Sequence, residues 1–404
     1  MRTLCTIETP RAPGRETRAP AQPAPATAMS HAVPMQHVNG TPFEAEVRAP
    51  AVQAPRVRVE WVDYAKGICI FFVVMLHVND LVQERAHAIG WLEEVVTFAR
   101  PFRMPDFFLI AGLFLASAMR RPWRRYLDSK VIHFFYLYVL WMTLAFGAMN
   151  VKHLIREDAG ALGIASAYFL RWIEPVGALW FIHILPVFFV VTRLLRPVPP
   201  WLVWLGAAAL HSLQIQSDWH VIREGASRYV YFYSGYVLAP YVFQIAAWAH
   251  ARAVRAFGYL ALWGVVNGLV VAAGWAWLPL VSLALGYAGA LAVIFAAVLM
   301  SKVAWTAPVR YLGQNSIVVY LSDFAVSMIV VGVIERLIPD LGARALIATA
   351  VTVLGAIVLW RVTLRTPARF MYVRPRWLRL AAASPVDEPA GEPRPRAPAL
   401  TEAA

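Results

Sequence analysis

The fold of this chain is decided by residues 58–81, which read RVEWVDYAKGICIFFVVMLHVNDL. The stretch begins with several charged residues, runs apolar from 68 to 76, and is then interrupted by His77. On a helix with about 3.6 residues per turn, Lys66 and His77 are close to three whole turns apart, so both side chains lie on one face. At about 1.5 Å per residue they are roughly 16 Å apart along the axis. A lysine at one membrane edge and a histidine near the middle predict a polar path into a helix bundle.

The composition is that of a membrane protein. Of the 404 residues, 59% are hydrophobic and only 15% are charged, whereas soluble globular domains carry about 25% charged residues. The net charge of +13 does not indicate a nucleic acid partner, because the arginines gather in tails and in short loops between apolar runs. Cys5 stands in a polar tail and Cys69 in the first apolar segment, so no disulfide is expected between them. The partner implied by this composition is the lipid bilayer.

Long apolar segments predict an all-α, polytopic integral membrane protein with about ten transmembrane helices. The segments are expected at residues 66–84, 98–119, 131–150, 177–195, 201–214, 229–246, 257–274, 277–300, 314–334 and 343–362. They lie in a transmembrane domain at 57–366. A disordered Pro/Ala/Arg-rich tail at 1–56 precedes this domain, and a C-terminal tail at 367–404, first basic and then disordered, follows it.

Basic residues in alternate loops predict the orientation of the chain. The loop after the second segment contains RRPWRRYLDSK, and arginines or lysines also follow the fourth, sixth, eighth and tenth segments. These loops are expected in the cytoplasm. Both termini are then cytoplasmic, and the loops at 151–176 and 214–228 face outward.

His77 is the first candidate for chemistry. An ionisable side chain within a membrane span is a functional-site candidate because it is costly to bury there. A neutral imidazole takes up a proton near pH 7, so the functional interpretation is a general base. The alternative is a histidine that is hydrogen-bonded in the bundle without a catalytic role. Asp80 follows at i+3, and it either orients the ring or is solvated at the outer membrane edge.

A second candidate region is FRMPDFFLIAG at 102–112. Pro105 is expected near the start of a helix, where its missing N–H costs least. Gly112 is expected to allow close contact between helices. Packing does not account for Arg103 and Asp106, which either pair with each other or line the outer mouth of a cavity.

The basic loop after the second segment carries Arg124, Arg125, Lys130 and His133. Most of its charges are expected to set the orientation of the chain in the membrane. Together with Lys66, which faces the same compartment, they also suit an anionic cofactor that approaches from the cytoplasm, because guanidinium and ammonium groups bind phosphates.

Two later segments add one candidate each. GALWFIH at 177–183 places Trp180 at the outer start of the fourth segment, where tryptophan is commonly an interface anchor. LGQNSIVVYLSD at 312–323 opens the ninth segment and places Asp323 two turns inside it, too deep to be simply solvated. The sequence has no G-x-S-x-G, H-E-x-x-H or paired Cys-x-x-Cys element, so neither a nucleophilic serine nor a zinc site is predicted.

The chain resembles the membrane acyltransferase-3 family over about residues 58–365, and four pieces in the family's order carry the resemblance. They are VDYAKGICIFFVVMLH at 62–77, FRMPDFFLIAG at 102–112, GALWFI at 177–182 and LGQNSIVVYL at 312–321. The resemblance implies transfer of an acyl group, acetyl or succinyl, from cytoplasmic acyl-CoA to a hydroxyl of a sugar or cell-envelope glycan. The implied location is the plasma membrane of a bacterium (its inner membrane), and no metal is expected.

The family pairs a basic residue with a histidine eleven residues later, and this pair falls here on Lys66 and His77. The family usually has arginine at the first position, and lysine lacks its bidentate phosphate geometry. Two arginines spaced by three after the second span correspond here to Lys130 and His133. Where members often end the ninth-span motif with histidine, this chain has Asp323.

Acyl transfer from a thioester needs a base for the acceptor hydroxyl and a stabiliser for the oxyanion. The resemblance assigns the base to His77, and the sequence leaves open whether Asp80 or Asp323 assists it. The other candidates divide into a group for the CoA phosphates and a group for the acceptor. The first group is Lys66, Arg124, Arg125, Lys130 and His133, and the second is Arg103, Asp106, Trp180 and Asp323.

Two other functions are compatible with the sequence. A transporter or flippase for an anionic or lipid-linked sugar, with His77 and Asp323 as a proton relay, also explains ionisable groups within the membrane, but the ordered family pieces favour the enzyme. A non-catalytic membrane subunit that binds a partner through its tails is the third hypothesis. The sequence leaves open whether the chain forms a homo-oligomer or works with a separate periplasmic partner protein.

Overall fold

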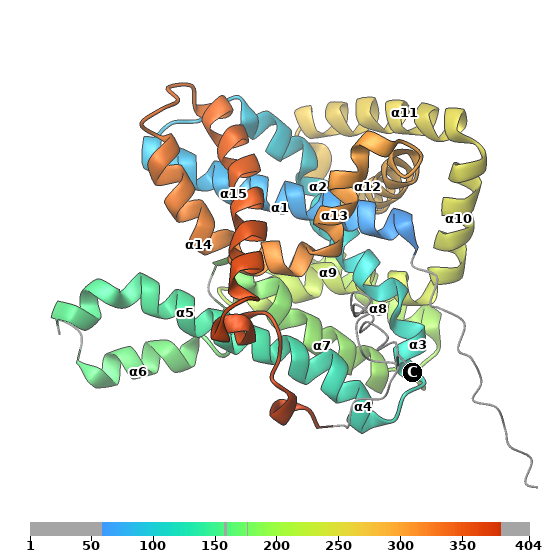
Figure 1. The fold of residues 1–404 in the computed structure, drawn as a ribbon. Coiled ribbons are helices and arrows are strands. Elements are labelled where there is room, and N and C mark those ends of the chain that lie inside the picture. Colours follow the sequence, from blue (N-terminus) through green and yellow to red (C-terminus); the bar gives the residue numbers. More distant parts are fainter. Residues whose placement is uncertain (1–58, 157–159, 176, 381–404) are drawn as a thin grey trace, which may run out of the picture. The chain divides into compact units, whose positions relative to one another are not determined.

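Helix α1 (Glu60–Ala86) is surrounded by other helices in the computed structural model, which describes residues 59–156, 160–175 and 177–380 (Figure 1). Its side chains Ile70, Val74 and Val78 are fully buried. The helices that contact it are α2 (Leu92–Leu113), α12 (Pro279–Met300), α13 (Ala307–Gln314), α14 (Ser316–Ile334) and α15 (Leu341–Thr363). The polar residues of α1 therefore face protein rather than lipid over much of its length.

The contact between α1 and α13 depends on two glycines. A Cβ atom on Gly313 would collide with the backbone carbonyl of Asp63, and one on Gly67 would collide with the carbonyl of Val309. Small residues let two helix backbones approach closely inside a membrane, where dispersion contacts rather than the hydrophobic effect hold helices together. This contact positions the end of α1 that carries Lys66.

Helix α2 begins at Leu92, before the predicted start of the second segment, and contains Pro101 and Pro105 in its interior. The expectation that Pro105 stands near a helix start was therefore wrong. The first turn of α2 carries glutamates, which are favourable at a helix N-terminus. Because these residues are charged, a search for apolar segments assigns them to a loop. The expectation for Gly112 is confirmed, because a Cβ there would collide with the backbone of α9 (His220–Val237).

The described residues contain helices and no strand, so the predicted all-α class is confirmed. The remaining elements are α3 (Leu115–Met119), α4 (Trp123–Leu127), the π-helical turn η1 (Asp128–Ile132), α5 (His133–Arg156), α6 (Ala161–Leu170), η2 (Gly177–Leu179), α7 (Trp180–Leu194), α8 (Pro200–Ser212), α10 (Ala239–Ala251), α11 (Ala253–Ala272), η3 (Trp275–Trp277), η4 (Ala304–Thr306), η5 (Pro367–Met371) and η6 (Arg376–Leu378).

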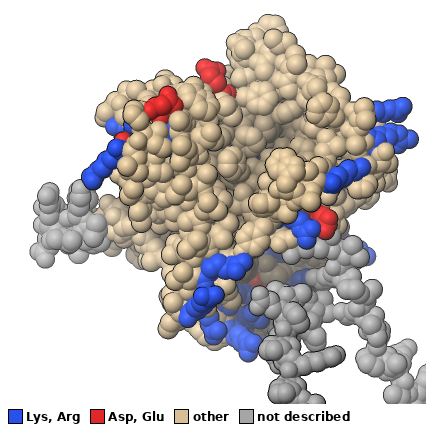
Figure 2. Space-filling model, turned by 45° about the horizontal axis from the view of Figure 1, so that its top comes forward, with Lys and Arg blue, Asp and Glu red and all other residues tan. Residues whose placement is uncertain are grey.

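Seven helical stretches within the described part of the chain are long and apolar enough to cross a membrane. Their residues are Glu60–Ala86, Trp123–Asn150, Gly177–Leu194, Ala253–Ala272, Pro279–Met300, Ser316–Ile334 and Leu341–Thr363. Figure 2 shows a wide uncharged area between basic side chains along the lower and right edges and acidic side chains near the top. The chain is therefore a multi-pass membrane protein, while the count of ten spans and the cytoplasmic location of both termini stay predictions.

Two segments differ from the expected pattern. The single segment expected at 229–246 is two helices, α9 and α10, which meet at Leu238. Pro240, in the first turn of α10, has no N–H with which to continue α9. The loop expected at 151–176 contains helix α6. The predicted disordered tail at 1–56 and the end of the C-terminal tail from 381 lie outside the described residues.

Candidate active site

Helices α1 and α14 bring His77 and Asp323 together. Nδ1 of His77 lies 2.5 Å from Oδ2 of Asp323, within hydrogen-bond distance. The side chain of Asp323 is 1% exposed and that of His77 is 27% exposed, so the carboxylate is covered while the ring remains accessible. An ionised carboxylate only accepts hydrogen bonds, so the bond uses the N–H at Nδ1 and leaves the lone pair on Nε2. This is the tautomer that a general base needs.

The structure gives different positions to Asp80 and Asp323, the two carboxylates considered as partners of His77. Asp80 is exposed, whereas Asp323, which was predicted on the acceptor side, makes the bond from a position 246 residues further along the chain. Oδ1 of Asp323 is buried, and no described residue forms a hydrogen bond with it. The ring is thus oriented by a buried group on another helix rather than by its neighbour on α1.

His77 lines a cavity of about 200 Å³, here called the histidine cavity. Its walls come from α1, α2, η2, α7, α9 and α14. The cavity contains ionisable and aromatic side chains together. Its polar and aromatic lining residues are His77, Arg103, Phe107, Trp180, Phe181, His220, Glu224, Arg228 and Tyr320.

Arg103 presents a buried guanidinium to the histidine cavity. The residue is 9% exposed, and its Nε and Nη1 atoms are buried without a hydrogen-bond partner among the described residues. No ion pair joins it to Asp106 among the described residues, and the carboxylate of Asp106 instead accepts a hydrogen bond from the Cys69 thiol on α1. A buried cation without a partner is costly. The guanidinium is therefore placed to meet a polar or anionic group of a ligand.

Glu224 and Arg228 also line the histidine cavity and were not predicted. They stand one turn apart on α9, and Nε of Arg228 donates to Oε2 of Glu224 at 3.0 Å. In the sequence they precede an apolar segment and resemble an outer loop, and only their i,i+4 spacing pointed to a helix. Trp180 stands opposite, with its ring centroid 5.5 Å from that of His220. The predicted acceptor residues Arg103 and Trp180 thus share one cavity with His77.

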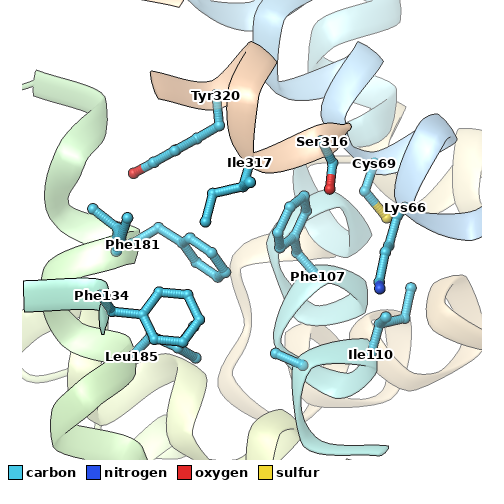
Figure 3. Close-up of a pocket in the computed structure, with 12 residues that line it drawn as sticks. Lys66, Cys69, Phe107, Ile110, Phe134, Phe181, Leu185, Ser316, Ile317 and Tyr320 are labelled. Atoms are coloured by element: carbon cyan, nitrogen blue, oxygen red, sulfur yellow. The ribbon is translucent and has the colours of Figure 1, made fainter. Parts of the chain in front are cut away.

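Lys66 lines a second cavity of about 170 Å³, here called the lysine cavity. Figure 3 shows its side chain reaching into one end of the cavity beside Ile110. The other walls are mostly apolar and come from α2, α5, α7 and α14. Phe134, Leu185 and Ile317 are among them. The lysine cavity is therefore an apolar space with a cation at one end.

The two cavities share three aromatic residues, Phe107, Phe181 and Tyr320, here called the aromatic partition. The ring centroids of Phe107 and Phe181 are 4.7 Å apart, and those of Phe181 and Tyr320 are 5.8 Å apart. Tyr320 is held in place by a hydrogen bond from its hydroxyl to the carbonyl oxygen of Ala178. Lys66 and His77, on one face of α1, thus stand in cavities on the two sides of one partition.

The predicted phosphate-binding residues lie at different depths. Arg124 and Arg125 are exposed on α4. Nζ of Lys130 lies 4.8 Å from the centroid of the Phe189 ring. Lys130 is also close enough to Lys66 for the two positive charges to repel each other. His133 packs its ring against Phe134, a wall of the lysine cavity, with centroids 5.4 Å apart. Lys130 and His133 are therefore near this cavity, and the two arginines are further out.

Among the described residues there is no group of three or more His, Cys, Asp or Glu placed to hold a metal ion. The model of the acyltransferase-3 family, described as an acyltransferase domain, matches residues 59–361. This match covers well over half of the chain and contains both cavities. No curated protein and no solved structure matches the chain. The family match and the apolar helices together lead to one conclusion: the chain belongs to the acyltransferase-3 family and is a multi-pass membrane acyltransferase.

Proposed function

We propose that the chain transfers an acyl group, acetyl or succinyl, from cytoplasmic acyl-CoA to a hydroxyl of a sugar or cell-envelope glycan at a bacterial inner membrane. The observation that carries the proposal is the bond between His77 and the buried Asp323, in a cavity that also holds the unpartnered guanidinium of Arg103. A base with a fixed tautomer and a nearby buried cation are the two groups that attack on a thioester requires.

The acyl group passes in one transfer from the sulfur atom of CoA to the oxygen atom of the acceptor hydroxyl. Nε2 of His77 takes the proton of the acceptor hydroxyl, whose oxygen forms a bond with the thioester carbonyl carbon. Arg103 supplies positive charge for the oxyanion that develops on the carbonyl oxygen. The carbon–sulfur bond then breaks, the acyl group stays on the acceptor, and the CoA thiolate takes the proton from His77. Asp323 stabilises the imidazolium between the two proton transfers.

The lysine cavity is our candidate for the donor. Its apolar walls suit the uncharged arm of acyl-CoA, while Lys66 at its end, with Lys130 and His133 close by, suits the phosphates. Arg124 and Arg125 would meet the phosphates from exposed positions on α4. Movement of the aromatic partition joins the two cavities and lets the thioester reach His77.

The first experiment follows label from radiolabelled acetyl-CoA and succinyl-CoA into envelope glycans, in membranes that contain the full chain. Loss of a general base lowers the rate by about 100-fold or more, so we expect this loss in His77→Ala. A matched control is His250→Ala, an exposed histidine at the end of α10, which should transfer label as the wild type does. Equal transfer by wild type and His77→Ala, at equal amounts of folded protein, would reject His77 as the base.

The same assay tests the transporter hypothesis, in which His77 and Asp323 relay protons. A transporter consumes no acyl donor, so acyl-CoA consumption that depends on His77 excludes it for this site. Transport of a sugar without any consumption of acyl-CoA would favour it instead. Membership of an acyltransferase family supports the enzyme.

A further inference from the structure

A third cavity, of about 380 Å³, adjoins the histidine cavity and shares Arg228 with it. We call it the arginine cavity. Helices α2 and α9 and the loop after α8 form most of it, and η3 with the start of α12 closes one side. The residues that matter for its chemistry are Arg100, Gln214, Gln216, Arg223, Arg228 and Trp277.

The arginine cavity carries positive charge without acidic groups in its walls. Arg100, Arg223 and Arg228 line it, and no Asp or Glu is among the described residues that do so. Arg100 pairs with Glu93 at 3.3 Å, and Glu224 pairs with Arg228 at 3.0 Å and with Arg223 at 4.0 Å, but neither glutamate lines this cavity. Each guanidinium has five N–H donors, so one such ion pair leaves donors for a ligand.

Two of the three arginines remain accessible. The side chain of Arg100 is 40% exposed and that of Arg223 is 43% exposed. Arg223 also donates to Nδ1 of His220, at 2.8 Å, which fixes its position beside the cavity. Arginine binds carboxylate and phosphate groups through paired N–H donors. The cavity is therefore suited to an anion.

The other walls suit a sugar. The Trp277 ring is 60% exposed, and the guanidinium of Arg100 lies 5.6 Å from its centroid. Gln214 has a positive φ of 44°, which is unusual for a residue other than glycine, and its amide donates to the carbonyl of Trp277 at 2.5 Å. Small-molecule sites combine an aromatic surface with a few fixed polar groups in this way.

The arginine cavity has no group placed to act as a base. His211 lines it, but its Nδ1 lies 2.7 Å from the carbonyl oxygen of Ser227 and its Nε2 lies 2.9 Å from the hydroxyl oxygen of Ser282. Both ring nitrogens are therefore used by the structure. The cavity is a place for binding, and chemistry belongs to the neighbouring histidine cavity, to which Arg228 connects it.

We propose that the arginine cavity binds the acceptor, and that the acceptor is an anionic saccharide. Its carboxylate or phosphate contacts Arg100 and Arg223, and one sugar face lies against Trp277. The reacting hydroxyl extends past Arg228, which lines both cavities, towards His77. That this saccharide is the acceptor rests on the proposed function; that the cavity binds it does not. The proposal also agrees with the predicted orientation, in which the loop at 214–228 faces outward, away from the donor.

The test is a binding measurement on the purified full chain in lipid nanodiscs, without an acyl donor. The probes are methyl glucuronide, glucose 6-phosphate and methyl glucoside, which offer a carboxylate, a phosphate and no charge. Hydrogen bonds to charged groups contribute about 1.5–3 kcal/mol, so we expect at least one anionic sugar to bind about tenfold or more tightly than the neutral glucoside. Which anionic sugar prevails distinguishes carboxylate from phosphate.

The variant Arg100→Gln/Arg223→Gln should bind the anionic sugars no better than the glucoside. Its matched control, Arg252→Gln/Arg255→Gln at the junction of α10 and α11, should keep the preference. Arg223→Gln alone, at an exposed side chain, covers the case in which the double variant does not fold. Equal binding of all three sugars, binding of none, or a preference that survives the double variant would overturn the proposal. The measurement uses no acyl donor and no turnover, so failure of the proposed chemistry is distinguishable from failure of this site.

Discussion

The lysine cavity and the histidine cavity share the three residues of the aromatic partition, but their other walls differ. Around Lys66 the walls are mostly aliphatic and aromatic, with a single cation at one end. Around His77 they include Arg103, Arg228 and Glu224. A mostly apolar space of this kind suits an uncharged chain. The comparison suggests that one face of α1 serves two tasks, with donor binding on one side of the partition and chemistry on the other.

The largest effect should come from breaking the His77 pair. In Asp323→Asn the amide no longer fixes the tautomer that leaves Nε2 unprotonated, so we expect acyl transfer to fall by about 1,000-fold. The measurement is single-turnover transfer from acetyl-CoA. Asp80→Asn, three residues after His77 and exposed, is the matched control and should change transfer by less than about threefold. A large effect of Asp80→Asn with a small effect of Asp323→Asn would reverse the assignment.

The next effect should come from the unpartnered guanidinium. In Arg103→Gln the developing oxyanion loses its positive charge, and removal of one such group costs about 100-fold in kcat. The KM for acyl-CoA should stay unchanged, because the donor binds on the other side of the partition. Arg103→Lys, which keeps the charge, should recover part of the rate. A changed KM with an unchanged kcat would place Arg103 in donor binding, and the two cavities would then not have separate roles.

Substitution in the lysine cavity should show the opposite pattern. Lys66→Gln removes a charged partner of the donor phosphates, so we expect the KM for acyl-CoA to rise about tenfold while kcat stays similar. Lys66→Arg should bind the donor at least as well as the wild type, because a guanidinium can contact a phosphate through two N–H groups. Steady-state kinetics with varied acyl-CoA measure both. A fall in kcat alone would mean that Lys66 acts in the chemistry.

The smallest effect is expected outside both cavities, at Asp340. Its carboxylate accepts hydrogen bonds from the N–H of Ala343 at 2.7 Å and from Nε1 of Trp91 at 3.1 Å, and these bonds lower its pKa below the ordinary value. A lowered pKa in the folded state stabilises the protein above the ordinary pKa, and this contribution is lost as the pH falls through the folded-state pKa. Asp340→Ala should therefore lower the Tm slightly at neutral pH, less so in acid, and leave acyl transfer unchanged. A thermal unfolding series against pH measures this.

Much of the fold was predictable because it depends on local patterns. The apolar lengths around α1, α12, α14 and α15 exceed what soluble helices need, so their membrane character was visible in the chain. The break between α9 and α10 was missed because an apolar run continues through it, although Pro240 marked the place. The start of α9 was missed because Arg223 and Arg228 make it polar.

The candidate site was predictable only in part. Arg103 was expected near the acceptor because packing does not account for an arginine there, and Trp180 because it opens the fourth segment on its outer side. Both line the histidine cavity. The role of Tyr320 was not predictable, because nothing in its own segment indicates that it separates two cavities. Asp106 was expected to serve the same site, and its bond to Cys69 depends on how α2 faces α1.

The helical, membrane-embedded character of the chain, and the shared helix face of Lys66 and His77, could be read from the residues alone. Composition and a periodicity over a few turns decide these properties. Only the tertiary structure decided that Asp323, 246 residues further on, rather than Asp80, bonds to His77. It also decided that an aromatic partition divides the path between Lys66 and His77. Contacts between helices depend on which faces of distant segments pack together. Helix periodicity shows which residues share a face, but it does not show which helix will contact that face.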